Sequence, residues 1–146
     1  MELRSPAFSN GEYIPAKYTC DGENISPPLK IHNVPAGTEA LVLVMDDPDA
    51  PMGTFDHWLA WNIPGQIIEI KEGVEPAGIP GMTDFGRPGY GGPCPPSGTH
   101  TYQFRLYALS KKLDLPRGTD KQELEAAMEG YIVSQALLKG KYQRGR

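Results

Sequence analysis

The sequence predicts a mainly β protein, and three observations lead to this prediction. Its 146 residues include 17 glycines and 15 prolines, about twice the usual combined share of these residues. Both residues interrupt helices and suit turns, so an all-α fold is excluded. Short apolar runs bounded by turn residues recur along the chain, and one segment alone carries a clear helix pattern. We therefore expect short strands and long loops within a single domain spanning residues 1–146.

Four strands are expected in the first half of the chain, each bounded by proline, glycine or aspartate. They are Leu29–Val34, Ala40–Met45, Trp58–Ile63 and the shorter Ile67–Ile70. Ala40–Met45 is a continuous aliphatic run, which is typical of a strand that is buried on both faces.

The clearest alternation lies in Thr101–Leu109. One face of this expected strand carries Tyr102, Phe104, Leu106 and Ala108, and the other carries Thr101, Gln103, Arg105 and Tyr107.

One helix is expected after a capping signal. Thr119 or Asp120 can cap it, with Gln122 or Glu123 three residues further on. The expected buried face carries Leu124, Ala127, Met128 and Tyr131, and Gly130 is a suitable terminator. The segment from Ile132 to Leu138 fits either more helix or a last strand.

Residues 76–98 form a long loop in which 13 of 23 residues are glycine or proline. A loop of this length inside a compact domain is usually functional or disordered. Because it carries Phe85, Arg87, Tyr90 and Cys94, we expect it to be ordered and functional. Its apolar residues could form a contact patch for a protein partner or pack onto the sheets; they are Ile79, Met82, Phe85 and Tyr90.

The net charge and the hydropathy of the chain argue against several classes of protein. The net charge of −4 argues against general binding to nucleic acid or anionic membranes. No apolar run is long enough for a transmembrane segment or a signal peptide, so we expect a cytoplasmic protein. Two cysteines, Cys20 and Cys94, are too few for a disulfide scaffold, but they could form a thiol pair or a single bridge.

The candidate polar residues flank the expected strands. His57 and His100 stand beside strand starts, whereas His32 lies inside a strand and has no expected role. The acidic run from Asp46 to Asp49 lacks the spacing of a calcium loop, so no metal site is expected. Cys94 and Ser97 lie near histidines, but prolines flank the cysteine, and neither residue is expected to be catalytic.

Taken together, these motifs resemble the phosphatidylethanolamine-binding protein family, also called Raf kinase inhibitor protein-like, and its compact bacterial and archaeal branch in particular. The resemblance rests on Asp-Pro-Asp-Ala-Pro at 47–51, on His57 at the head of an apolar strand, and on Gly-Gly-Pro at 91–93 with His100 and Tyr102 downstream. It runs in order from Tyr18-Thr19-Cys20-Asp21-Gly22 to Tyr142-Gln143-Arg144. In place of the arginine that follows the second histidine in animal members, this chain has Thr101.

The resemblance implies a two-sheet antiparallel β-sandwich with Greek-key-like connections, one or two short helices, and residues 132–138 as a late strand. It also implies a small anion-binding pocket at one edge, for ligands such as phosphorylated ethanolamine headgroups. Carried over by motif position, the lining would be Asp47, Ala50, Pro51, His57, Gly92, Pro93, His100 and Tyr102. No cofactor is implied, and a homodimer is expected by analogy.

A carboxylate beside a phosphate raises an electrostatic problem, since like charges repel. The problem disappears if Asp47 orients a protonated histidine, His57 or His100, and does not touch the anion itself. Affinity should then weaken as pH rises through the histidine pKa. Two other functions stay open: a module that inhibits a kinase or serine protease, and a hydrolase that uses the same histidines with Asp47.

Overall fold

The fold was examined in a computed structural model that describes residues 1–145. In chain order its elements are β1 (Glu2–Arg4), the 3-10 turn η1 (Ala16–Tyr18), β2 (Leu29–His32), β3 (Ala40–Asp47), β4 (Phe55–Pro64), β5 (Glu69–Ile70), β6 (Ile79–Pro80), β7 (His100–Leu109), α1 (Lys121–Met128) and β8 (Ile132–Tyr142).

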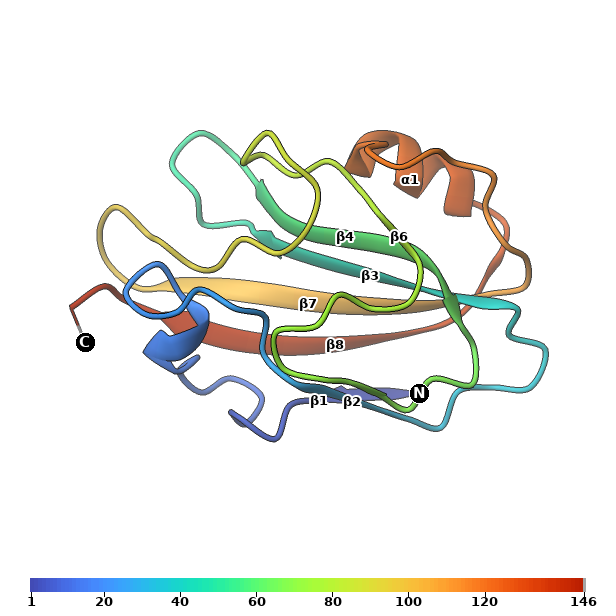
Figure 1. The fold of residues 1–146 in the computed structure, drawn as a ribbon, viewed down its shortest axis with the longest axis horizontal. Coiled ribbons are helices and arrows are strands. Elements are labelled where there is room, and N and C mark those ends of the chain that lie inside the picture. The colour runs from blue at the N-terminus through green and yellow to red at the C-terminus, as the bar shows by residue number, and fades with distance from the viewer. Residues whose placement is uncertain (146) are drawn as a thin grey trace.

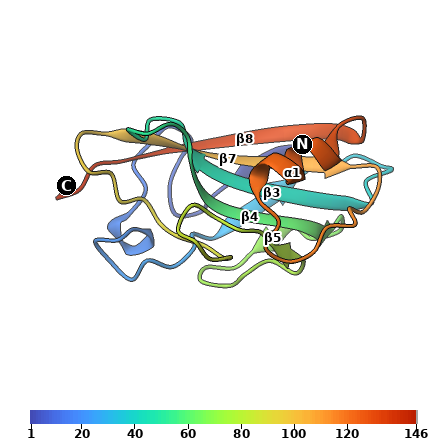
Figure 2. The same cartoon turned by 90° about the horizontal axis from the view of Figure 1, so that it is seen from above.

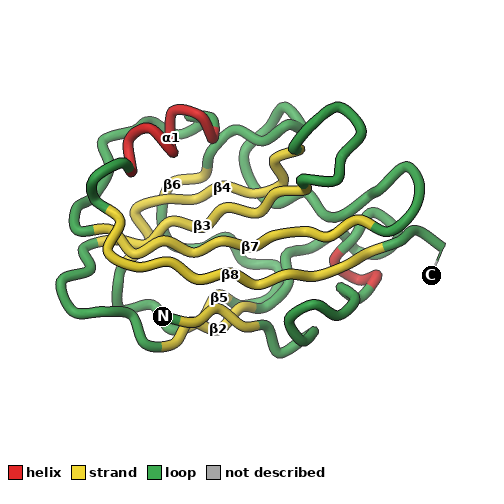
Figure 3. Tube along the Cα trace, turned by 180° about the vertical axis from the view of Figure 1, so that it is seen from behind, coloured by secondary structure: helices red, strands yellow, loops and turns green. Residues whose placement is uncertain are grey.

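The strands form two antiparallel sheets, which confirms the predicted fold class. The smaller sheet has the order β1-β2-β5, and the larger has the order β6-β4-β3-β7-β8 (Figures 1 and 3). The chain changes sheet between β2 and β3, between β4 and β5, and between β5 and β6. After these crossings β7 returns to lie beside β3, as in a Greek key.

β3 is the central strand of the larger sheet, and all eight of its residues are buried. Leu41, Leu43 and Met45 belong to the core between the two sheets. Val42 and Val44 face the other way and pack in a second cluster with Leu124 and Met128 of α1. The helix therefore covers the outer face of the larger sheet (Figure 2), which explains the continuous apolar run of β3.

The expected elements exist, with differences at their ends. β2 stops at His32, because Asn33 adopts a left-handed φ of 59° just before Val34 and Pro35. The α1 cap is Asp120, whose side chain accepts a hydrogen bond from the Glu123 N–H. α1 ends at Met128, so Tyr131 lies beyond it and is partly exposed.

Three strands were left open or missed by the sequence patterns. Residues 132–138 belong to the strand β8, as the resemblance implies. The short strands β1 and β6 were not predicted, because two or three residues are too few to show a periodicity.

The N-terminal segment packs tightly against β8 at Gly140, and this contact gives a stability prediction. A Cβ at position 140 would lie 2.5 Å from Cγ1 of Ile14 and 2.8 Å from the ring of Phe8, both buried. We expect Gly140→Ala to lower the free energy of unfolding by about 1–3 kcal/mol through overpacking. Chemical denaturation measures this, with Ser134→Ala on the same strand as control. Equal stability of the two variants would contradict the prediction.

Candidate functional site

Three strand ends meet at one end of the larger sheet and enclose a small cavity. β3 ends there, β4 and β7 begin there, and the loops after β3 and before β7 complete the wall (left in Figure 1). The cavity has a volume of about 220 Å³ and is lined by Asp47, Ala50, Pro51, Phe55, His57, Phe85, Cys94, Pro95, Pro96, His100 and Tyr102. Larger, more open hollows lie elsewhere, but no histidine lines them.

Six of the eight sequence-predicted site residues line this cavity, and Gly92 and Pro93 do not. These two are buried against the loop that follows η1. The Gly92 N–H donates to Oδ1 of Asn24 at 2.9 Å, and the Pro93 carbonyl accepts from the Cys20 N–H at 3.1 Å. The Gly92 N–H and the Pro93 carbonyl thus hold two loops together and are not offered to the cavity.

Five residues of the lining lie outside the set carried over by motif position: Phe55, Phe85, Cys94, Pro95 and Pro96. Phe55 and Phe85 make an edge-to-face contact at 4.9 Å between ring centroids, and each also contacts the His57 ring. Phe85 had been singled out as a loop residue, but its place beside His57 depends on a long-range contact that no local pattern encodes.

His57 faces the cavity because β4 carries a bulge at this residue. Met45 pairs with Trp58 and Asp46 pairs with Asp56, so His57 is the extra residue on its strand. Trp58 faces the inner core, and strict alternation would therefore turn His57 to the outer face, as it turns Leu59. The bulge turns the imidazole inward instead.

Asp47 orients His100 and leaves His57 to another partner. His100 Nδ1 donates to Oδ2 of Asp47 at 2.6 Å, and both side chains are buried. The other Asp47 oxygen accepts the Asp49 N–H at 2.9 Å. Burial, together with the charge of Asp47 and a hydrogen bond to it, raises the pKa of the Tyr102 hydroxyl, which therefore stays protonated.

His57 Nδ1 lies 2.7 Å from the carbonyl oxygen of Gly91. A carbonyl can only accept, so Nδ1 carries the proton in the neutral ring. Burial lowers the pKa of His57 below its usual 6.5; the Gly91 carbonyl and the charge of Asp47 oppose this effect but do not cancel it. The ring is therefore predominantly neutral at pH 7.

The cavity contains no fixed positive charge. Among the residues that line it there is neither lysine nor arginine. Nδ1 of each histidine is already bonded to the protein, which leaves Nε2 of each ring for a ligand. The positive charge that balances a bound anion must therefore come from a protonated imidazole. Alternatively, the anion can bind in its protonated form.

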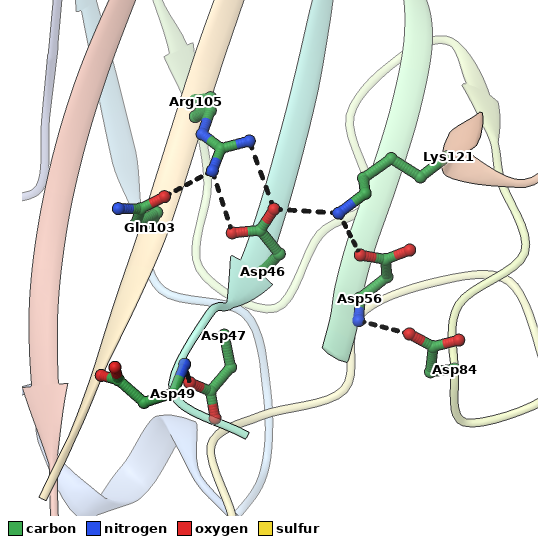
Figure 4. Close-up of polar contacts among 8 residues, drawn as sticks. All are labelled: Asp46, Asp47, Asp49, Asp56, Asp84, Gln103, Arg105 and Lys121. Atoms are coloured by element: carbon green, nitrogen blue, oxygen red, sulfur yellow. Dashed lines mark hydrogen bonds and ion pairs between the residues drawn. The ribbon is translucent and has the colours of Figure 1, made fainter. Parts of the chain in front are cut away.

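Behind the cavity, on the outer face of the larger sheet, an ion network joins the end of β3 to the start of β4 (Figure 4). Lys121 Nζ lies 3.1 Å from Oδ2 of Asp46 and 2.6 Å from Oδ1 of Asp56. Arg105 of β7 also contacts Asp46, at 3.3 Å. Asp46 and Asp56 directly precede Asp47 and His57 in the chain, so Lys121 fixes both strands at the positions that carry the site.

The two cysteines form a disulfide between Cys20 and Cys94, with 5.4 Å between their Cα atoms. The bond links the loop after η1 to the cavity wall across 74 residues of sequence. Of the two alternatives that the sequence left open, a thiol pair or a bridge, the structure contains the bridge.

Of the two alternatives for the apolar residues of the 76–98 loop, a contact patch or packing onto the sheets, the structure mainly shows packing. Tyr90 stacks edge-on against Trp58, and Ile79 packs on the outer cluster. Met82 is half-buried, and Phe85 is 39% exposed. These residues therefore do not form one continuous exposed surface.

Residues 1–145 contain neither a recognisable metal site nor a membrane-spanning helix. No group of three or more His, Cys, Asp or Glu side chains in this range is arranged to hold a metal ion. No helix in the same range has the length and apolar character needed to cross a membrane.

Comparisons with known proteins agree with the fold and with the motifs. The family model described as phosphatidylethanolamine-binding protein matches residues 4–143. A UPF0098 protein of Pyrococcus horikoshii is 51% identical over 155 residues, covering 99% of this chain and 78% of the relative. A UPF0098 protein of Methanothermobacter thermautotrophicus is 48% identical over 151 residues, covering 99% of this chain and 100% of the relative.

Two solved structures are similar over almost the whole chain. One is a phosphatidylethanolamine-binding protein homologue of Chlamydia trachomatis, with a TM-score of 0.95, 39% identity, and coverage of 98% of this chain and 97% of that one. The other is Escherichia coli YbcL, described as a new member of the mammalian PEBP family. It has a TM-score of 0.90 and 28% identity, and the match covers 97% of each chain.

The lowered pKa of His57 predicts a pH dependence of stability. The unfolded chain binds a proton near pH 6.5 and the folded chain only at lower pH, so protonation favours unfolding. The stability that the neutral ring provides is complete above about pH 6.5 and falls as pH decreases towards the folded pKa, with a slope of at most about 1.4 kcal/mol per pH unit. His57→Gln should remove this part of the slope in urea titrations, and His32→Gln should not. An unchanged slope in His57→Gln would refute the assignment.

Removing the lysine of the outer network should have two effects. Lys121→Met leaves Asp56 without its cation and Asp46 with Arg105 alone, and we expect a loss of about 1–3 kcal/mol of unfolding free energy. Because the charge of Asp46 raises the pKa of His57, unmasking that charge should raise it further, as read from the ring signals in NMR. Lys112→Met, at an exposed position, is the control. A destabilised variant with an unmoved His57 titration would contradict the electrostatic link.

Proposed function

This chain belongs to the phosphatidylethanolamine-binding protein family, and on that premise we propose that its histidine-lined cavity binds a small anion bearing a phosphate group, such as phosphoethanolamine. The observation that supports the proposal most is the convergence of His57, His100 and Tyr102 from two strands on one cavity. Each histidine has one ring nitrogen fixed by the protein and one left over. When a ring is protonated, its free Nε2 becomes a donor that is already oriented, which suits an anion.

The volume and the walls of the cavity suit a small ligand with an apolar part. About 220 Å³ holds a phosphate group and a few further atoms. The remaining wall consists of prolines and of the rings of Phe55 and Phe85. This mixture of a few polar groups and apolar walls is common in small-molecule sites.

We propose binding without turnover. A hydrolase would need a nucleophile or an activated water beside the histidines. One candidate sulfur, that of Cys94, is already bonded to Cys20. Release of p-nitrophenolate from p-nitrophenyl phosphate, if lost in His57→Gln, would overturn this part of the proposal.

Inhibition of a kinase or a serine protease is the alternative, and it has less support. Of the four loop residues considered for a partner surface, Phe85 alone is exposed. Met52, in the loop after β3, is 99% exposed and follows the cavity residue Pro51 in the chain, but it is a single side chain. The homodimer and the cytoplasmic location stay predictions.

Binding is tested by titrating the protein with phosphoethanolamine near pH 6 while the histidine ring signals are followed by NMR. We expect saturable shifts at His57 and His100 and none at His32. His57→Gln should weaken binding by about tenfold or more, the effect of losing one hydrogen bond to a charged group. Asp47→Ala should remove the His100 response, because that ring loses its fixed orientation. No shift at millimolar ligand would overturn the proposal.

The pH dependence of affinity follows from the lowered pKa of His57. Binding of an anion favours the imidazolium, so affinity is highest below the free pKa, which lies under 6.5, and falls as pH rises above it. A phosphate monoester also titrates in this range, since its second pKa is about 6. Sulfate does not titrate here, so its affinity isolates the contribution of the protein. A flat sulfate affinity between about pH 5.5 and 8.5 would exclude histidine control.

A further inference from the structure

We propose that the Cys20–Cys94 disulfide is a reducible site on the cavity wall, and that its opening by a dithiol lowers the affinity of the cavity for its anion. The inference rests on the proposed function for its affinity readout. Three observations support it: the exposure of the bond, its place in the lining, and the few other contacts that hold the wall in position.

The bond is accessible to a reductant. Cys94 is exposed and Cys20 is half-buried. Attack by a thiolate needs a direct approach to one sulfur, and exposed disulfides are the labile ones in proteins. Because Cys94 is the more exposed residue of the two, we take its Sγ as the point of attack.

The same cysteine is part of the binding site. Cys94 lines the cavity together with the two residues that follow it, Pro95 and Pro96. Because each proline ring fixes its own φ, these two residues form a stiff unit with little freedom to move independently of Cys94. The position of Cys94 thus determines where this part of the wall stands.

Few polar contacts apart from the disulfide hold this part of the wall, in which Pro95 is buried and residues 96–98 are exposed. Within residues 1–145, residues 95–98 make no hydrogen bond or ion pair to any other residue. The segment is attached after its end by Thr99, whose hydroxyl contacts Gln143, and before its start by Cys94. Besides the disulfide, Cys94 has one backbone hydrogen bond, to the Tyr102 hydroxyl.

The neighbouring loops stay joined without the disulfide. The Tyr90 hydroxyl donates to the Tyr18 carbonyl at 2.6 Å, and the contacts of Gly92 with Asn24 and of Pro93 with Cys20 are made by backbone and amide groups. In Figure 1 the blue segment around η1 and the yellow loop before β7 lie at the same end of the molecule. Reduction therefore loosens residues 94–98 and leaves the two-sheet core in place.

The reaction is a thiol–disulfide exchange with a dithiol as the reductant. One thiolate of the dithiol attacks Sγ of Cys94, the bond between the two cysteines breaks, and Cys20 leaves as a thiolate that takes up a proton. The second thiol of the reductant then attacks the mixed disulfide and releases Cys94, which is protonated in turn. The protein gains two electrons and two protons, and the reductant leaves as a cyclic disulfide.

The loss of affinity depends on the fraction of time for which residues 94–98 occupy the position that binds the anion. If the loosened segment occupies its binding position for a tenth to a fifth of the time, apparent affinity falls by about fivefold to tenfold. The direction is fixed by the structure, because Pro95 and Pro96 contribute to the lining in the disulfide-bonded state.

The test compares inorganic phosphate binding near pH 6, measured by calorimetry, for the oxidised protein, the protein reduced with dithiothreitol, and Cys20→Ser/Cys94→Ser. Thiol counting confirms the redox state, and circular dichroism confirms that each form is folded. We expect weaker binding by about fivefold to tenfold in the reduced protein, recovery after reoxidation, and the same weak binding in the double variant with or without dithiol.

Other outcomes separate this inference from the proposed function. Equal affinity of the oxidised and reduced forms would overturn the redox inference and leave anion binding intact. Unfolding of the reduced chain at the assay temperature, or failure of the dithiol to reduce the folded protein, would also overturn it. Absence of binding by the oxidised protein would overturn the proposed function together with the inference. Should the double variant fail to fold, reoxidation of the wild-type protein supplies the control.

Discussion

Two adjacent carboxylates are buried at the end of the central strand, and both need partners to be stable there. Asp46 and Asp47 are 1% and 3% exposed and point to opposite faces of the larger sheet. On the outer face, Lys121 and Arg105 neutralise Asp46. On the inner face, Asp47 is satisfied by His100 and by the backbone. Through the partners of these two carboxylates, the end of β3 is linked to α1, to β7 and to the cavity.

The division of charge between the two faces explains the character of the site. Two fixed cations near the strand ends, Lys121 and Arg105, contact carboxylates on the outer face. Within the cavity lining, the groups that can become cationic are the imidazoles of His57 and His100. A site of this kind matches its charge to a ligand by taking up a proton, whereas a site with fixed arginines attracts anions at every pH. The apolar rings around His57 reinforce this property, because burial keeps the empty site uncharged.

Local patterns in the sequence were sufficient for the main elements. The run Ala40–Met45 predicted a strand buried on both faces, the alternation over Thr101–Leu109 predicted β7, and the capping signal at Asp120 predicted α1. The motifs also identified six residues of the cavity lining through the family resemblance. These features could be read because side-chain periodicity, capping and turn chemistry depend on residues close together in the chain.

The sequence by itself determined the main strands and the helix in chain order, the polar residue types at the strand ends, and the resemblance to the family. The tertiary structure alone decided which of them act together. It turned His57 inward through a bulge that exists only relative to the register of β3, paired Asp47 with His100, and joined Cys20 to Cys94. It also directed the backbone of Gly92 and Pro93 away from the cavity. The physical reason is common to all four: each depends on contacts between segments 34 or more residues apart or on strand register, and local periodicity carries no information about either.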